Sequence, residues 1–181
     1  VGIIEDISKR MTMDFKQEGD AIYIIGKSKN DLGSSEYLHK LAGVNLSPAP
    51  YFDMDEEFLV QQTALRLIHA QIIQSAHDVA DGGLFTALVE SAKQRNLGFI
   101  CTQVDMTIRT DAYLFGEAQS RIVVSVKKEH ITTFESMLAD CPFEKVGEVT
   151  ASEVMVNAAN WGDIAQWKTS YDEALEKIIN A

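Results

Sequence analysis

The chain has 181 residues, 46% of them hydrophobic, and 16 basic against 27 acidic side chains give it a formal net charge of −11. This length suits one domain of ordinary size with a sizeable core. Because the sequence holds no basic cluster, we expect neither nucleic acid nor an anionic membrane surface as a partner, and no stretch reads as a membrane span or signal peptide.

The cysteines and histidines indicate neither a disulfide framework nor a metal site. Cys101 and Cys141 are far apart, and the four histidines do not cluster. We therefore expect reduced thiols, no bound metal and a cytoplasmic location. The chain opens on Val1 without an initiating Met, and we interpret it as a piece of a longer protein.

The first fifty residues predict an irregular start followed by a buried strand. Residues 1–18 mix apolar and charged side chains without a clear period. A turn at Gly19-Asp20 leads into a short apolar strand over 21–25. A short helix is expected over 32–42, and the prolines in 44–52 predict a loop.

Residues 53–73 predict the clearest helix. Asp53 is suited to cap its start, and Glu56 completes a pair that resembles a capping box. The apolar stripe at helical spacing consists of Phe58, Leu65, Ile68 and Ile72.

The rest of the chain alternates strands and helices. The expected elements are an extended segment at 75–79, a helix over 84–95, strands at 97–104 and 121–126, a helix over 129–140, strands at 143–149 and 153–156, and a closing helix over 171–179. This alternation predicts an α/β (α+β) fold with a mixed β-sheet, in a single domain over 1–181.

Residues 75–84 form the first segment that could carry chemistry. A strand turns here into a helix, with Asp81 placed to cap it and Gly82-Gly83 in its first turn. Glycines let another group approach the N–H donors of a helix start, which attract anions. Asp78 and Asp81 would repel a bare phosphate unless Mg²⁺ bridges them to it, or unless they are spent on capping and hydroxyl contacts. The alternative is a capped helix whose glycines serve tight packing.

Residues 114–121 form the second segment. If this run is extended, Glu117, Gln119 and Arg121 point to one side and Ser120 to the other. A carboxylate, an amide and a guanidinium would then converge on a polar ligand, with the guanidinium suited to phosphate. The alternative is a solvated edge with an internal Glu–Arg pair.

Residues 31–38 and His77 are weaker candidates. The run Gly33-Ser34-Ser35 opens a helix, with Ser34 or Ser35 as N-cap and Glu36 in the first turn, which alone is an ordinary helix start. His77 could act as an acid or base, although a lone histidine more often forms a hydrogen bond in a core.

In this order, the three segments resemble the second half of the phosphoribosylformylglycinamidine synthases, also called formylglycinamide ribonucleotide amidotransferases. That family reads approximately LGGSEYL, AHDVSDGGL and LFGESQSR, where this chain has LGSSEYL over 32–38, AHDVADGGL over 76–84 and LFGEAQSR over 114–121. Two positions depart from the pattern: Ser34 replaces a glycine and Ala118 a serine. Residues 2–6 and Gly19-Asp20 also match, so the resemblance spans the chain.

The resemblance implies a mixed sheet with helices packed mainly on one face, like the carboxy-terminal domain of aminoimidazole ribonucleotide synthetase. It also implies a ligase of purine biosynthesis that uses ATP, magnesium and glutamine to convert formylglycinamide ribonucleotide to formylglycinamidine ribonucleotide. The nucleotide-binding domains of the same protein would precede this chain, with residues 1–18 leading in from them, and a glutaminase subunit or domain would complete it. We expect no cofactor bound tightly to this chain and no activity from it alone.

The resemblance assigns a set of binding residues but no catalytic residue. The substrate- or phosphate-binding candidates are His77, Asp78, Asp81, Gly82, Gly83, Glu117, Gln119, Ser120 and Arg121, with Gly33, Ser34, Ser35 and Glu36 as a secondary set. An anion is expected at Gly82-Gly83, within reach of Arg121 or Gln119. Because the family is internally duplicated, an alternative is a structural domain with a retired ligand site, and another is a different member of the superfamily that includes selenophosphate synthetase.

One further expectation concerns the surface of the chain. Val1, Ile3, Ile4 and Ile7 lack an evident local partner in the sequence. The removal of a neighbouring domain leaves apolar surface behind. We therefore expect these residues to be exposed and the chain to be able to form a homodimer.

Overall fold

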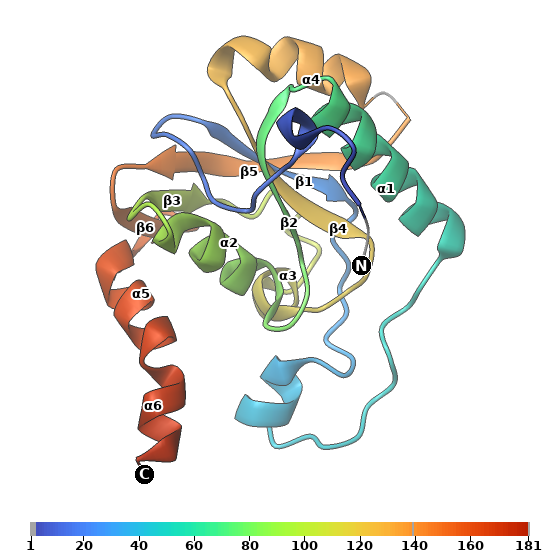
Figure 1. Ribbon diagram of the computed structural model, residues 1–181. Coiled ribbons are helices and arrows are strands. Elements are labelled where there is room, and N and C mark those ends of the chain that lie inside the picture. Colours follow the sequence, from blue (N-terminus) through green and yellow to red (C-terminus); the bar gives the residue numbers. More distant parts are fainter. Residues whose placement is uncertain (1–2, 139, 181) are drawn as a thin grey trace.

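The protein is built on a mixed seven-stranded sheet in the order β2-β4-β1-β5-β3-β6-β7 (Figure 1). The computed structural model describes residues 3–138 and 140–180. Among the described strands, β3 and β6 pair in parallel and the other pairings are antiparallel. The strands are β1 (Ala21–Gly26), β2 (Ile73–Asp78), β3 (Gly98–Cys101), β4 (Arg121–Val126), β5 (Phe143–Thr150), β6 (Glu153–Val156) and β7 (Ala159–Asp163). The predicted mixed-sheet α/β fold is confirmed.

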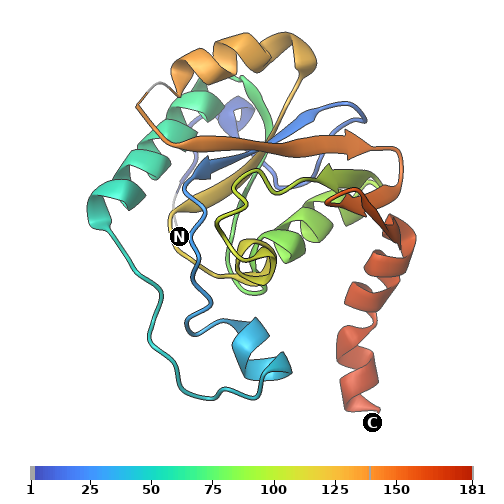
Figure 2. The same cartoon turned by 180° about the vertical axis from the view of Figure 1, so that it is seen from behind.

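Helices cover both faces of this sheet, with α1 and α4 on one face and α2 and α3 on the other (Figures 1 and 2). The helices are η1 (Ile7–Lys9), η2 (Tyr37–Leu41), α1 (Met54–His69), α2 (Gly83–Lys93), α3 (Thr110–Phe115), η3 (Lys128–His130), α4 (Ile131–Met137), α5 (Ile164–Asp172) and α6 (Ala174–Ile179). The expectation that helices lie mainly on one face is therefore wrong.

Strand β1 explains why both faces need cover. All six of its residues are buried, and side chains alternate between the faces of a sheet. Ile22 and Ile24 join the core beneath α2, whereas Tyr23 and Ile25 join the core beneath α1 and α4. A strand that is apolar at every position needs an apolar layer on each side.

Helix α1 begins where the sequence predicts it but ends at His69, so the predicted end at 73 is wrong and Ile72 lies beyond the helix. The side chain of Asp53 accepts hydrogen bonds from the N–H groups of Asp55 and Glu56, so the predicted cap is confirmed. The Glu56 carboxylate instead lies 2.7 Å from the Lys29 ammonium, so the capping box is wrong.

The buried residues of α1 are Val60, Thr63, Ala64 and Leu67. Phe58 and Leu65 of the predicted stripe are 62% and 44% exposed. The helical period is correct, but the stripe that faces the sheet is offset from the predicted one. The predicted stripe was therefore wrong at these two positions, and α1 presents an apolar outer face.

Two regular elements were missed, and one helix starts earlier than predicted. Strand β7 pairs with β6 through a tight turn in which Asn157 and Ala158 both have positive φ. Its sequence, ANWGD, has weak strand propensity, so pairing with β6 determines its conformation. Helix α3 has only six residues, too few for a clear period. Helix α5 begins at Ile164, because Asp163 and Gln166 form a capping box.

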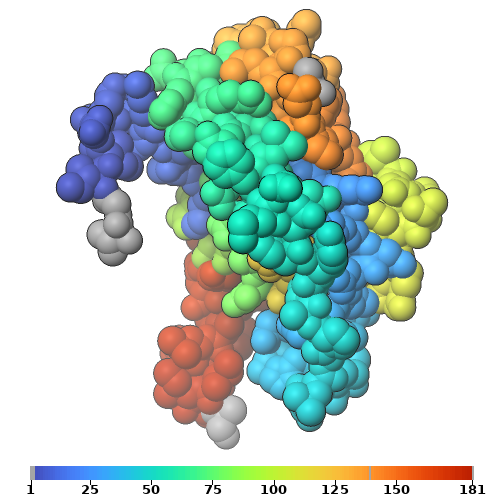
Figure 3. Space-filling view, turned by 90° about the vertical axis from the view of Figure 1, so that its right-hand side faces the viewer, coloured from blue at the N-terminus to red at the C-terminus, as the bar shows by residue number. Residues whose placement is uncertain are grey.

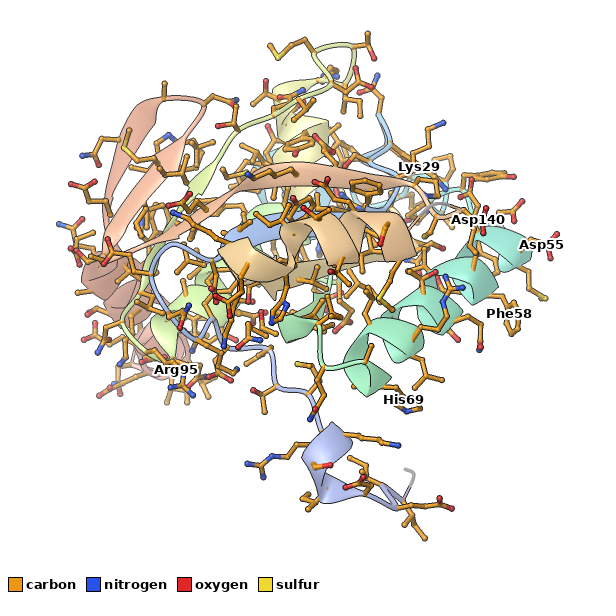
Figure 4. All side chains as sticks on the ribbon, turned by 90° about the horizontal axis from the view of Figure 1, so that it is seen from above. Lys29, Asp55, Phe58, His69, Arg95 and Asp140 are labelled. Carbon is orange, nitrogen blue, oxygen red and sulfur yellow. The ribbon has the colours of Figure 1, made fainter. Side chains whose placement is uncertain are left out.

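Two arms extend from the body of the molecule, and we call residues 37–52 and 164–180 the arms (Figures 1 and 3). Their exposed apolar side chains are Leu41, Val44, Leu46, Tyr51, Phe52, Tyr171, Leu175, Ile178 and Ile179. The segment that carries η1 stands apart as a third projection (Figure 4), and its Ile3 and Ile7 side chains are 94% and 68% exposed.

The predicted exposure of Ile3, Ile4 and Ile7 is thus confirmed, and Val1 lies outside the described residues. No helix among the described residues is long and apolar enough to cross a membrane.

Candidate functional site

The three sequence motifs meet at one cleft of about 490 Å³ beside α1 and the ends of β2 and β4. We call residues 31–36, 78–83 and 115–121 the motif corner. The cleft is lined by Ser34, Pro50, Glu57, Val60, Gln61, Asp78, Val79, Ala80, Asp81, Glu117, Gln119, Ser120, Arg121 and Ile122. Segments far apart in the sequence therefore form one concave surface, which is the usual setting of a ligand site.

Glu117 joins the three segments of the motif corner. Its Oε1 atom accepts a hydrogen bond of 2.8 Å from the N–H group of Gly82 and another of 2.8 Å from that of Glu36. The first donor lies at the start of α2 and the second just before η2. A carboxylate at a helix start also interacts favourably with the helix dipole.

Arg121 supports this corner from inside the protein. The residue is 3% exposed, and its guanidinium donates to the carbonyl oxygens of Gly116 and Ala118 at 2.6 and 3.0 Å. Burial lowers the pKa of Arg121 to about 10, so it stays charged at neutral pH. Its Nε and Nη2 atoms thus bind the loop that carries Glu117, and its buried Nη1 atom has no hydrogen-bond partner among the described residues.

Gly83 is required for close packing in the motif corner. It has a φ of +72°, and a Cβ atom there would lie 2.7 Å from the carbonyl carbon of Phe115 and 2.8 Å from the oxygen of Gly116. Both are backbone atoms, which cannot swing away. At Gly82, with a φ of +82°, a Cβ atom would overlap the side chain of Thr86. These contacts support the packing interpretation of the two glycines.

The predicted cap of α2 is wrong. Gly82 is the N-cap residue, in the left-handed conformation and without a side-chain cap of its own. Glu117 accepts the Gly82 N–H instead, from another segment of the chain. Asp81 lines the cleft. A capping partner distant in sequence leaves no signal in the local pattern, so sequence reasoning gave this role to the nearest aspartate.

The predicted alternation of residues 117–121 is also wrong, although Glu117, Gln119 and Arg121 all line the cleft. The strand begins only at Arg121, and Ser120 has a φ of +63°, so the side chains before it do not alternate. The amide of Gln119 donates to the carbonyl oxygen of Glu117 at 3.3 Å. Ser120 donates from Oγ to Oε2 of Glu57 at 2.7 Å, which ties the loop to α1.

Residues 31–36 form a turn held by several hydrogen bonds, in addition to the helix start that the sequence predicts. Asp31 accepts hydrogen bonds from the N–H groups of Gly33 and Tyr51 at 2.8 and 3.2 Å. Ser34 has a φ of +53°, a conformation that glycine adopts more easily. Of the two serines considered as caps, Ser35 has the fitting contact, because its Oγ accepts from the Leu38 N–H at 3.3 Å.

His77 does not line the cleft. Its Nε2 atom lies 2.8 Å from a carboxylate oxygen of Glu90 on α2. The hydroxyl of Tyr171 on α5 donates to the other oxygen of Glu90 at 2.6 Å. This arrangement links β2, α2 and α5, and it matches the interpretation of His77 as a hydrogen-bonding residue of the structure.

The cleft is acidic. Glu57, Asp78, Asp81 and Glu117 line it, and the guanidinium of the one lining arginine is bonded to backbone carbonyls. The described residues include no group of His, Cys, Asp or Glu placed to hold a metal ion. The lining therefore suits hydroxyl and amide donors better than a bare phosphate. Since Gly82 N–H is engaged by Glu117, the geometry argues against an anion at Gly82-Gly83.

Comparisons with known proteins agree with the resemblance read from the motifs. Residues 17–157 match the family described as AIR synthase related protein, C-terminal domain. The chain is 37% identical over 158 residues to the phosphoribosylformylglycinamidine synthase subunit PurL of Alkaliphilus metalliredigens, covering 86% of this chain and 21% of that protein. The PurL subunit of Leuconostoc mesenteroides is 37% identical over 185 residues, covering 100% of this chain and 24% of that protein.

A solved structure with the same fold is that of Thermotoga maritima PurL complexed with FGAR. It superposes with a TM-score of 0.76 at 17% identity, over 90% of this chain and 30% of that one. The chain spans about a fifth to a quarter of the length of the curated relatives it matches. These findings confirm the resemblance and the fold class that the sequence predicts.

Proposed function

The chain belongs to the AIR synthase related family, through its C-terminal domain, and on this premise we propose that it is a domain of a phosphoribosylformylglycinamidine synthase. The observation that carries the proposal is the meeting of the three motifs at one cleft. Support comes from the 37% identity to PurL subunits over the length of the chain. The proposed reaction is the ATP-dependent amination of formylglycinamide ribonucleotide in purine biosynthesis.

In this proposal the chain contributes one wall of a substrate site. Asp78, Asp81 and Gln119 offer acceptors and an amide to the hydroxyl and amide groups of a ribonucleotide. ATP and magnesium would be held by parts of the protein outside this chain, because the described residues offer no metal-binding group. The substrate phosphate would likewise find its donors elsewhere, given the acidic lining of the cleft.

The remaining features follow from the same proposal. The full-length protein would be a cytoplasmic ligase, and a glutaminase subunit or domain would supply its ammonia. Residues 1–181 would form a single carboxy-terminal domain that follows the nucleotide-binding part. His77 would then be a structural residue, because it is engaged away from the cleft by Glu90, whose other oxygen accepts from Tyr171.

A second candidate function is that of a structural domain with a retired ligand site. The contact that favours it is the hydrogen bond from Gly82 N–H to Glu117, which fills the place where a ligand anion would bind. The burial of the Arg121 guanidinium favours it as well. In that case the motif corner would support the neighbouring domains and touch no substrate.

The activity test uses the full-length protein that contains this chain. Purified protein is given ATP, magnesium, formylglycinamide ribonucleotide and ammonium, which replaces the glutaminase product. We expect ADP formation that depends on the ribonucleotide. ATP consumption with selenide or thiamine monophosphate, and none with the ribonucleotide, would instead assign the protein to another branch of the superfamily.

The isolated chain provides the matching control. We expect residues 1–181 alone to form no ADP under the same conditions, since no segment resembles a triphosphate-binding loop with its lysine. Magnesium-dependent ATP hydrolysis by this chain would show that our assignment of ATP binding to other parts of the protein is wrong.

A further inference from the structure

The hydrogen bonds of Glu117 fix the distance between two walls of the cleft. One wall is the turn at the start of α2, which carries Asp81, and the other is the segment that carries Ser34. A single oxygen atom accepts the N–H groups of both walls, at 2.8 Å each. Two donors on one acceptor atom must lie close together, so Glu117 holds the walls at a fixed spacing.

The loop that carries Glu117 is itself held firmly. The buried Arg121 guanidinium binds the carbonyl oxygens on either side of Glu117, those of Gly116 and Ala118. Hydrogen bonds that involve a charged group are about twice as strong as neutral ones. The backbone on both sides of Glu117 is therefore anchored to the interior, and its carboxylate reaches outward from a rigid base.

Aromatic contacts also join the loop that carries Glu117 to the η2 segment and to α2. The ring of Phe115 stacks on that of Tyr37 with centroids 5.3 Å apart and an angle of 5° between the planes. Phe115 also meets Phe85 of α2 edge to face at 6.0 Å. The 115–121 loop thus lies between the η2 segment and α2, in contact with both.

We propose that Glu117 is a positioning residue that sets the width of the cleft through its hydrogen bonds, and that its carboxylate performs no chemistry on the ligand. This inference rests on the proposed function only for its effect on activity. Its structural part concerns this chain alone, because the two N–H donors and the acceptor all lie within it.

The first test measures hydrogen exchange in the full-length protein. In the wild type, the amides of Glu36 and Gly82 should exchange slowly. In Glu117→Ala both should exchange at least about tenfold faster, because each amide loses a hydrogen bond to a charged acceptor. In Glu117→Gln both should stay slow, since the side-chain oxygen remains. Unchanged exchange in Glu117→Ala would overturn the proposal whatever the protein catalyses.

The second test measures steady-state kinetics of the same variants. A positioning role predicts that Glu117→Ala raises the KM for formylglycinamide ribonucleotide at least about fivefold with a smaller change in kcat, and that Glu117→Gln restores KM. A role in proton transfer or metal binding predicts instead that Glu117→Gln loses kcat as fully as Glu117→Ala, which would overturn our assignment. If the wild type were inactive, the exchange test would still decide.

The matched control is Glu148→Ala. It removes a carboxylate of the same kind, which forms a surface ion pair with Lys128 at 3.2 Å. We expect unchanged exchange at Glu36 and Gly82 and unchanged KM. Should Glu117→Ala fold poorly, Glu117→Ser, which keeps a short polar side chain but cannot span the distance, must reproduce its rapid exchange.

Discussion

The motif corner and the arms use their side chains in opposite ways. In the corner, the charged groups of Glu117 and Arg121 are spent on backbone atoms of the same chain. In the arms, large apolar side chains such as Leu175 and Ile178 are 69% and 75% exposed. The polar residues that the sequence marks as candidate ligand contacts thus bind the backbone of the same chain, and the exposed apolar residues of the arms are available to meet other surfaces. The predictions below test this contrast.

The largest effect should come from a glycine in the corner. Gly83→Ala places a Cβ atom 2.7 Å from backbone and retains a φ of +72°, so we expect a loss of about 3 kcal/mol in the free energy of unfolding. Gly43→Ala is the matched control in an arm, with a φ of +66° and no atom within 4 Å of the added Cβ. It should cost only about 1 kcal/mol. Equal losses in urea denaturation would contradict the packing role of Gly83.

Removing the buried guanidinium should have the next largest effect. Arg121→Met leaves the carbonyl oxygens of Gly116 and Ala118 without their donor, and we expect a loss of about 2 kcal/mol. The control is Arg109→Met, which breaks a surface pair with Asp111 and should change stability by less than about 0.5 kcal/mol. Thermal unfolding of both variants measures the difference, and a tolerated Arg121→Met would show that the corner does not depend on this side chain.

Asp20 is a buried polar side chain that lacks the hydrogen bonds that stabilise the motif corner. One carboxylate oxygen accepts from Gln17 at 3.1 Å, and the other has no hydrogen-bond partner within the described residues. Burial raises the pKa of Asp20 above its ordinary value of 3.8. Between these two pKa values the folded state binds the proton more tightly than the unfolded state, so this group's contribution to stability falls as pH rises.

We therefore expect Asp20→Asn to stabilise the protein by about 1 kcal/mol at pH 7 and to flatten the fall in stability above pH 3.8. Urea denaturation between pH 4 and 7 measures both effects. A variant that is less stable at pH 7, with the pH dependence intact, would mean that the second oxygen of Asp20 has a partner in solution. Glu176→Gln, a change at an exposed carboxylate of α6, is the control.

The smallest effect on stability should come from the arms. Leu175→Ser combined with Ile178→Ser removes exposed side chains, so the free energy of unfolding should change by less than about 0.5 kcal/mol. Leu88→Ala, at a fully buried position, should cost about 2–5 kcal/mol by comparison. Sedimentation of the isolated chain should show less self-association in the double variant. An unchanged association constant would show that these two side chains take no part in a homodimer contact.

The sequence predicted the fold through its periodic and apolar segments. Strand β4 begins at Arg121 and β6 at Glu153, as their β-rich runs indicate, and the cap of α1 was evident from Asp53. Strand β7 was missed because its conformation depends on pairing with β6, which leaves no strong local pattern. The apolar outer face of α1 was misread because an amphipathic period does not say which of two apolar stripes faces the sheet.

The candidate site was only partly predictable. The motifs correctly marked Asp78, Asp81, Ser120 and their neighbours as one region, and the structure brings them to one cleft. The roles within that region were not readable, because the capping of α2 by Glu117 joins residues that are distant in the sequence. Whether these residues bind a ligand stays a prediction.

The measurement that tests the central claim most directly is ligand-dependent hydrogen exchange in the full-length protein. We expect formylglycinamide ribonucleotide with a non-hydrolysable ATP analogue to slow exchange in peptides that cover residues 78–84 and 116–121. The peptides of α4, none of whose residues line the cleft, should be unaffected. If both ligands bind and protect only other parts of the protein, the cleft is not a substrate site and the chain serves as a structural domain.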